Sequence, residues 1–393
     1  MLDVAVIGAG IHGAGFAQAA AAAGHSVLLL EQHGVAAGTS SRSSKLIHGG
    51  LRYLETGQIR LVRESLHERA TLLRLAPELV QLRRFYVPIY RHTRRRPWTL
   101  RLGLSIYALL AGFGGGTRFG TVPRRDWSGL DGLDTAGLQA VFWYHDAQTD
   151  DRALTQAVVR SAQQLGAQFI CPARFLGAAL HEHGVDIRFI AQAGEQQCRV
   201  RVLINAAGPW ADELAHTITP AIPVPVFEHV QGAHIVLPWS IERGIYYVES
   251  PRDGRAIFVM PWHGQLLIGT TETRFHGDPA TVSPSSSEIH YLLGVLKHYF
   301  PRFRHSSPDD IVASFAGVRV LPGGSSHAFH RSRETILAVD RSYQPRVLSI
   351  YGGKLTTWRA VSQRALQRVA ASLPARRRIA NTDAIALHPL PGS

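Results

Sequence analysis

The sequence predicts an α/β fold in which a Rossmann-like dinucleotide-binding domain is interrupted by an inserted antiparallel-sheet domain. A strand–glycine–helix–strand unit opens the chain at residues 4–30, and strand-then-glycine patterns return at 200–209 and 347–353. Short alternating apolar strands fill the region between these returns. The expected boundaries are 1–84, 144–215 and 334–375 for the dinucleotide domain, 85–143 and 216–333 for the inserted substrate domain, and 376–393 for a C-terminal tail.

The first unit consists of a strand at residues 4–7, an alanine-rich helix at 14–23 that ends at Gly24, and a strand at 27–30. A Gly/Ser-rich loop and an amphipathic helix at 59–75 follow it. The segment 85–143 is irregular and basic, and the chain is expected to leave the dinucleotide domain there. The later elements are helices at 150–165 and 355–373 and strands at 200–205, 233–237, 256–260, 266–269 and 347–351.

The composition limits the class of protein. With 393 residues and 45% hydrophobic residues, the chain can form two domains. The net charge of +13 favours anionic partners, and arginine suits phosphate groups. Nucleic acid is not expected, because no zinc finger, RNP-like strand or long basic tail accompanies the charge.

Only two cysteines are present, Cys171 and Cys198, which argues against a disulfide framework, a zinc site and an iron–sulfur cluster. The N-terminus has no secretory signal, and no apolar run reaches the roughly 18 residues of a membrane-spanning helix. The expected location is therefore the cytoplasm.

A dinucleotide fingerprint lies in the first unit. Gly8 permits the tight turn, Gly10 lets backbone amides approach a pyrophosphate, and Gly13 lets helix and strand pack closely. Glu31, at the end of the next strand, suits an adenosine ribose. The alternative is an ordinary glycine-rich turn.

The fingerprint does not itself separate FAD from NAD. It occurs once, at the N-terminus, and the later glycine returns at Gly208 and Gly353 suit a single long cofactor. Because no second complete fingerprint exists for a nicotinamide cofactor, FAD is the preferred interpretation.

The stretch GTSSRSSKLIHGGLRYLE at residues 38–55 resembles the signature of the FAD-linked glycerol-3-phosphate dehydrogenases. Further matches are DDRAL at 150–154, NAAGPW at 205–210, GAHIV at 232–236, IGTTE at 268–272, GVR at 317–319 and GGKLTT at 352–357. The resemblance covers essentially the whole chain and implies a DAO-type flavoprotein that oxidises glycerol 3-phosphate.

Four departures from the family pattern stand out. Gln231 replaces a common lysine, Glu272 replaces an aspartate, and Arg333 is followed by glutamate rather than aspartate. The chain also stops near the point where family members continue into a helical C-terminal cap domain.

The resemblance implies a substrate site beside the flavin. His48 is the candidate general base, or alternatively a histidine that only binds the loop backbone. Arg52, Arg319 and Arg333 are the expected phosphate clamp, with Tyr53 as an added donor. The alternative for these arginines is an ordinary solvated surface position.

Several residues are expected near the cofactor itself. Lys354 suits the reduced flavin, unless it faces water at a helix start. Thr356 and Thr357 are expected to bring backbone amides near the ring, and Leu355 beside them is also expected to contact the cofactor. The hydroxyls of Thr39, Ser40 and Ser44 suit phosphate or ribose oxygens, or alternatively complete their own turn.

The segment 91–110 is basic at its start and apolar beyond Trp98. This pattern suits attachment to an anionic membrane surface, on the cytoplasmic face of the inner membrane, or alternatively a core helix with a solvated basic end. The electron acceptor, quinone or oxygen, stays open, as does a homodimer. Two other functions also stay open: an FAD oxidase of amino or 2-hydroxy acids, and a non-catalytic FAD-binding relative.

Overall fold

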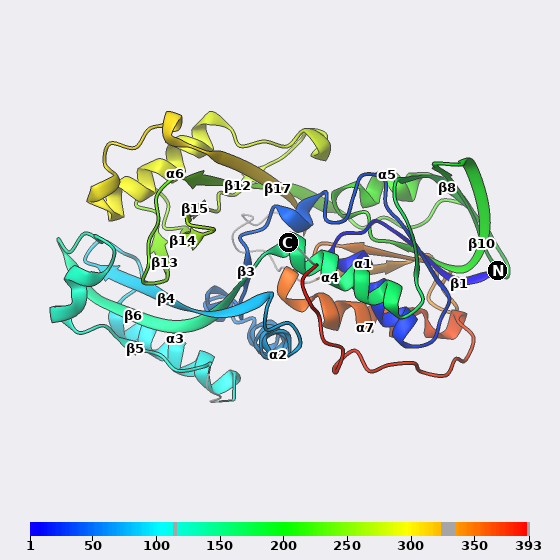
Figure 1. The fold of residues 1–393 in the computed structure, drawn as a ribbon, viewed down its shortest axis with the longest axis horizontal. Helices are drawn as coiled ribbons and strands as arrows, with labels where there is room; N and C mark the ends of the chain where they lie inside the picture. Colours follow the sequence, from blue (N-terminus) through cyan, green and yellow to red (C-terminus); the bar gives the residue numbers. More distant parts are fainter. Residues whose placement is uncertain (113–115, 324–334, 391–393) are drawn as a thin grey trace.

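The computed structural model describes residues 1–112, 116–323 and 335–390, which form two sheets and the helices that cover them (Figure 1). Arg333, one of the predicted clamp residues, lies outside the described residues. The first sheet occupies one half of the molecule and contains both β1 (Leu2–Ile7) and β10 (Gly194–Asn205).

The parallel core of the first sheet is the predicted dinucleotide-binding unit. β1 pairs with β2 (Val27–Leu30) on one side and with β10 on the other, and β2 pairs with β7 (Gln168–Ile170). β19 (Val347–Tyr351) pairs in parallel with the last residues of β10 and carries β18 (Ile336–Val339) as an antiparallel edge.

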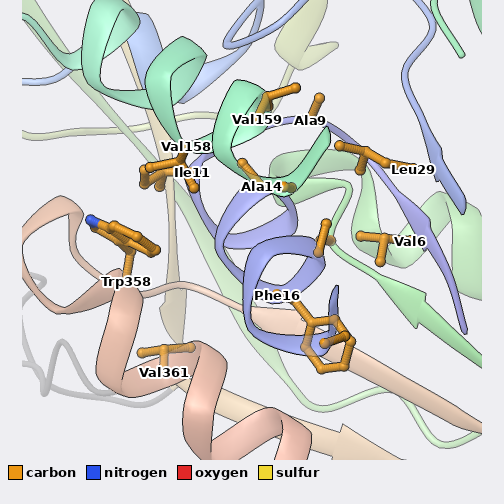
Figure 2. Close-up of a cluster of buried hydrophobic side chains, with 14 of the residues drawn as sticks. Val6, Ala9, Ile11, Ala14, Phe16, Leu29, Val158, Val159, Trp358 and Val361 are labelled. Atoms are coloured by element: carbon orange, nitrogen blue, oxygen red, sulfur yellow. The ribbon is translucent and has the colours of Figure 1, made fainter. Parts of the chain in front are cut away.

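Three helices cover one face of this sheet: α1 (Ile11–Ala22), α4 (Asp151–Gln164) and α7 (Trp358–Val369). α1 has alanine or glycine at most positions, so its neighbours approach closely, and Figure 2 shows Trp358 and Val158 beside Ile11. The opposite face packs against α5 (Ala211–His216) and against strands that extend the sheet, which are β8 (Ala173–His181), β9 (Gly184–Ala191) and β11 (Ile218–Thr219).

The second sheet has ten strands and faces the first across the middle of the molecule (Figure 1). Its strands are β3 (Leu46–Ile47), β4 (Val80–Tyr90), β5 (Gly120–Thr121), β6 (Leu138–Thr149), β12 (Phe227–Leu237), β13 (Ile245–Glu249), β14 (Ala256–Trp262), β15 (Gln265–Gly269), β16 (Thr273–Arg274) and β17 (Ala313–Pro322). α6 (Ser286–Tyr299) covers one face, and α2 (Ile59–Leu75) and α3 (Pro97–Leu110) cover the other.

The segment 85–143 is regular, which corrects the expectation of an irregular stretch. It contains most of β4, the whole of α3 and the start of β6. The exposed residues 81–84 of β4 include Arg83 and Arg84, and these charges conceal the strand in the sequence. β4 begins before the expected boundary at residue 84, and β6 continues past the one at residue 143.

Candidate functional site

A cavity of about 930 Å³ lies between the two sheets. Its walls come from the ends of β1 and β2, the loop from Ala37 to Tyr53, β17, and the turn after β19. The predicted site residues that line it are Gly8, Gly10, Glu31, Thr39, Ser40, Ser44, His48, Arg52, Tyr53, Gly208, Arg319, Gly353, Lys354, Leu355 and Thr356.

The glycines of the fingerprint are required by close backbone packing. A Cβ on Gly13 would lie 1.9 Å from the carbonyl oxygen of Gly8, so helix α1 approaches the strand turn without a side chain between them. Gly8 has φ +101°, and a Cβ there would lie 2.7 Å from the carbonyl oxygen of Ala206. Gly13 therefore acts through packing and does not line the cavity.

The N-terminus of α1 opens onto the cavity at Gly10. The Oγ of Ser40 accepts a hydrogen bond from the backbone N–H of Ile11 at 2.9 Å. Aligned peptide dipoles give this helix end a partial positive charge, which favours an anionic group.

His12, which the sequence reasoning missed, also lines this part of the cavity. Burial, and to a smaller degree the charge of Arg364, lowers the pKa of His12 to about 4, so its imidazole is neutral at pH 7. Its buried Nδ1 has no hydrogen-bond partner among the described residues. Its position inside the fingerprint, between Gly10 and Gly13, could have identified it as a cavity residue from the sequence.

Glu31 is held by backbone donors at the end of β2. One carboxylate oxygen accepts from Ala9 N–H at 2.8 Å, and the other accepts from His33 N–H at 2.9 Å. The side chain borders the cavity, where its carboxylate suits ribose hydroxyls.

The loop hydroxyls have protein partners. Thr39 donates from its Oγ1 to the carbonyl of Val318 at 2.7 Å, and Ser44 Oγ lies 3.0 Å from Nε2 of His234. His234 is fully buried, and burial, with the charges of Arg319 and Lys45, holds its pKa well below the ordinary value. Contacts of Thr39, Ser40 and Ser44 with phosphate or ribose oxygens stay predictions.

The end of the cavity beside the second sheet is cationic. Lys354 Nζ lies 3.7 Å from the ring centroid of Tyr53, and the guanidinium of Arg52 lies 5.7 Å from the same centroid. Arg319 donates from Nη2 to Oγ1 of Thr270 at 2.9 Å. Lys354 meets Arg52 and Tyr53 only in the folded chain, and Arg319 of β17 lines the same cavity.

Arg255, which was not predicted, also lines the cavity, and its Nε lies 3.3 Å from the carboxylate of Asp253. It donates to the carbonyl of Glu272 at 2.7 Å, and both residues line the cavity. Arg255 follows Gly254 in a turn of the second sheet, and no recognisable motif surrounds it that could have identified it. Gln231, by contrast, does not line the cavity and bonds instead to Glu288 at 2.6 Å.

His48 lies between the cationic end and the turn before α7. Its backbone N–H donates to Oγ1 of Thr356 at 3.1 Å, and the residue lines the cavity. This bond joins the loop after β3 to the turn before α7, and it is shielded from water because Thr356 is buried. The predicted roles of His48 and of the cations stay proposals.

The arrangement defines a dinucleotide-dependent enzyme of the flavoprotein class. One cavity is lined both by a helix N-terminus and a carboxylate, which suit an ADP moiety, and by His48 with several cationic side chains. Nδ1 of His12 has no hydrogen-bond partner among the described residues and can serve a polar atom of a bound group, and a Cβ at Gly208 would meet no atom within 4 Å. The residues present therefore fit FAD.

The sequence comparison identifies the family. Residues 3–359 match the family model of the FAD-dependent oxidoreductases (DAO), so the chain belongs to this family and FAD is its cofactor. The predicted fold class, the cofactor and the classification as an enzyme are confirmed.

The chain is also similar to individual relatives. It is 38% identical to a glycerol-3-phosphate dehydrogenase of Pseudomonas aeruginosa, over 93% of this chain and 71% of the relative. It is 35% identical to the D-erythritol 1-phosphate dehydrogenase of Brucella abortus, over 93% of this chain and 73% of the relative. The structure of the Bacillus halodurans glycerol-3-phosphate dehydrogenase complexed with FAD matches with a TM-score of 0.76 and 25% identity, over 98% of this chain and 68% of that one.

Proposed function

We propose that this enzyme oxidises sn-glycerol 3-phosphate to dihydroxyacetone phosphate. The observation that carries the proposal is that Arg52, Arg255, Arg319 and Lys354 line the same cavity as His48. A cluster of cations suits a phosphate dianion, whereas a carboxylate substrate needs fewer positive charges. The names of the relatives from Pseudomonas aeruginosa and Bacillus halodurans support the same substrate.

Each residue has a definite task in this proposal. The guanidinium groups of Arg319 and Arg52 hold phosphate oxygens and fix the position of the secondary alcohol. An imidazole nitrogen of His48 accepts the hydroxyl proton, and the Lys354 ammonium stabilises developing negative charge. When bound, FAD supplies the acceptor for the hydride that leaves the carbon bearing this hydroxyl group.

D-Erythritol 1-phosphate is the second candidate substrate, because the relative from Brucella abortus is named for it. The two polyol phosphates present the same anionic group, so the cationic cluster suits both. An amino-acid or 2-hydroxy-acid substrate is disfavoured by the number of cations at the site.

The test is reduction of the bound flavin in a stopped-flow instrument, with glycerol 3-phosphate, erythritol 1-phosphate, glycine and lactate as substrates. Glycerol 3-phosphate should give the highest second-order rate constant for reduction of the flavin. No reduction by either polyol phosphate would contradict the proposal.

Arg319→Lys keeps the charge but removes the planar fork, so kcat/KM for glycerol 3-phosphate should fall about ten- to a hundredfold. Arg319→Ala should lose more. FAD content should stay at the wild-type level, because the residue is assigned to the substrate. The matched control is Arg188→Ala, which removes an exposed arginine of β9 and should leave kcat/KM unchanged.

We further infer that α3 attaches the enzyme to an anionic membrane surface, from which a quinone is accessible as the electron acceptor; oxygen is the alternative. Trp98, Leu102 and Leu109 are 69%, 55% and 60% exposed on the outer side of this helix. Among the described residues, no helix is long and apolar enough to cross a bilayer. Attachment would therefore use this exposed apolar stripe and the arginines that precede it.

A further inference from the structure

The segment from His48 to Glu55 carries three of the proposed substrate residues, His48, Arg52 and Tyr53, yet it contains only a short 3-10 turn at Leu51–Leu54. A catalytic group must be held within a fraction of an ångström to be effective. The contacts that fix this segment therefore matter for the reaction.

A buried carboxylate lies directly behind the segment. Oδ1 of Asp146, near the end of β6, accepts the backbone N–H of Gly49 at 3.3 Å. The hydroxyl of Tyr107 donates to Oδ2 at 2.8 Å, and Arg69 donates to Oδ1 and completes an ion pair. Asp146 is 1% exposed.

The charge balance of this group favours a fixed geometry. Burial raises the pKa of Asp146, while the positive charge of Arg69 and the three donors counter the rise. Arg69 is also buried and lies on α2. A buried ion pair whose carboxylate also accepts from Tyr107 and Gly49 has few alternative arrangements, so it is suited to holding the Gly49 amide in place.

Gly49 shows how closely the segment approaches this group. A Cβ on Gly49 would lie 2.3 Å from the Tyr107 hydroxyl and 2.5 Å from Cδ2 of Leu66. Any larger residue would push the segment away from Asp146. The packing therefore explains a glycine directly after the candidate base.

The other end of the segment has its own anchor. Glu55 forms an ion pair with Arg95, which also pairs with Glu249 at 2.6 Å. Arg95 precedes α3, and Tyr107 lies in the last turn of α3. The helix thus supports the segment at both ends.

We propose that Asp146 and Tyr107 are positioning residues that hold the Gly49 amide, so that His48 and the turn bearing Arg52 keep a productive orientation in the cavity. The proposal rests on the function proposed above, because it assigns those two residues to the reaction. Asp146 and Tyr107 act through the backbone and touch neither substrate nor cofactor.

The test compares Tyr107→Phe with the matched control Tyr246→Phe. Both changes remove a buried hydroxyl that donates to an aspartate, because Tyr246 donates to Asp131 at 2.9 Å in a part of the second sheet that does not line the cavity. The measurements use the FAD-loaded enzyme: kcat and KM for glycerol 3-phosphate, the pH profile of kcat, and hydrogen exchange of the peptide 46–55.

Tyr107→Phe should lower kcat about tenfold and change KM less than about threefold, because the phosphate clamp is largely retained. Amide hydrogen exchange of the peptide 46–55 should be faster than in the wild-type enzyme. The pH profile of kcat should be shifted from the wild-type profile. Tyr246→Phe should change none of these quantities. Asp146→Asn is the second variant, and it should lower kcat in the same way, because it removes the ion pair with Arg69 that fixes the acceptor of the Gly49 amide.

Unchanged kcat and unchanged exchange in the FAD-loaded Tyr107→Phe enzyme would overturn the proposal, as would equal effects in the Tyr246→Phe control. Hydrogen exchange needs no substrate. If wild-type flavin is not reduced by a polyol phosphate, the proposed function fails while the exchange data still decide whether Tyr107 holds the segment.

Discussion

Two histidines border the functional region, the half-buried His12 and the fully buried His234, and desolvation keeps both neutral at pH 7. Their positions differ. His234 bonds through Nε2 to Ser44 and stacks on Phe315, with ring centroids 4.8 Å apart, so it supports the loop and the second sheet. His12 lies on the first turn of α1 and packs against the turn at Gly353, where a Cβ would lie 2.2 Å from its Nε2.

The lowered pKa of His12 predicts a pH-dependent stability of the FAD-free protein. Between pH 6.5 and about pH 4, the unfolded chain binds a proton at residue 12 and the folded chain does not. The free energy of unfolding should therefore fall as the pH falls through this window, by at most about 3 kcal/mol from this group. His12→Asn should reduce the slope, as measured by urea unfolding at pH 7 and pH 4.5.

His234 contributes in the same direction, so some slope should remain in His12→Asn. His183→Asn serves as the control, because the His183 side chain is 86% exposed and should not affect the slope. An unaltered slope in His12→Asn would show that His12 is protonated in the folded protein.

Helix α3 is apolar on two sides. Leu100, Leu104 and Tyr107 are buried against the second sheet, while Trp98, Leu102 and Leu109 face outward. Figure 1 shows α3 on the outer side of this sheet, opposite α6. A core helix with a solvated outer face does not need three large exposed apolar side chains, so the outer stripe favours membrane attachment.

The double variant Leu102→Glu, Leu109→Glu should lose binding to vesicles that contain phosphatidylglycerol, as measured by co-sedimentation. Both side chains are exposed, so the free energy of unfolding should change by no more than about 0.5 kcal/mol. Wild-type binding should weaken at high salt, because surface charge contributes to it.

Ile379→Glu is the control, since Ile379 is 62% exposed on a different segment. Equal vesicle binding by the wild-type protein and the double variant would exclude the α3 stripe as the attachment surface.

The elements differ in how far they can be predicted from sequence. The unit β1–α1–β2 is local, and its glycines and apolar runs lie within a few turns of one another, so its pattern is sufficient. For α3, a core helix was only one of two open interpretations, because apolar residues on both sides weaken the helical periodicity. The Asp146 contact joins residues 97 positions apart, and Arg255 has no motif, so neither can be derived from local pattern.

At the scale of the whole molecule, the residues that follow α7 pack back onto the half that contains the first sheet. Residues beyond Leu373 run back along α1 and α2, where Ile379 N–H donates to the carbonyl of Ala22 and Leu387 N–H donates to that of Leu75. Leu387 is 2% exposed in the core that α1, α4 and α7 share. The expected C-terminal tail is therefore packed onto the dinucleotide domain up to this residue.

Arg359 of α7 is the polar link in this packing. Its side chain is 3% exposed, pairs with the buried Glu68 of α2 at 3.1 Å, and donates to the carbonyl of Thr382 at 3.1 Å. The same guanidinium pairs with Asp383. One side chain thus joins two helices and the last described segment.

Arg359→Ala should lower the free energy of unfolding by about 3 kcal/mol, because it leaves the Glu68 carboxylate buried without its cation. Arg364→Ala is the matched control on the same helix: Arg364 pairs with Glu64 of α2 but is 44% exposed, so its loss should cost less than about 1 kcal/mol. Urea unfolding of the FAD-loaded protein measures both effects.

Trypsin should also cut faster at Arg376–Arg378 in Arg359→Ala, because the segment after Leu373 loses its link to α7. The FAD content should stay at the wild-type level, since Arg359 does not line the cavity. Equal stability and equal cleavage of the two variants would show that apolar contacts such as that of Leu387 hold the segment by themselves.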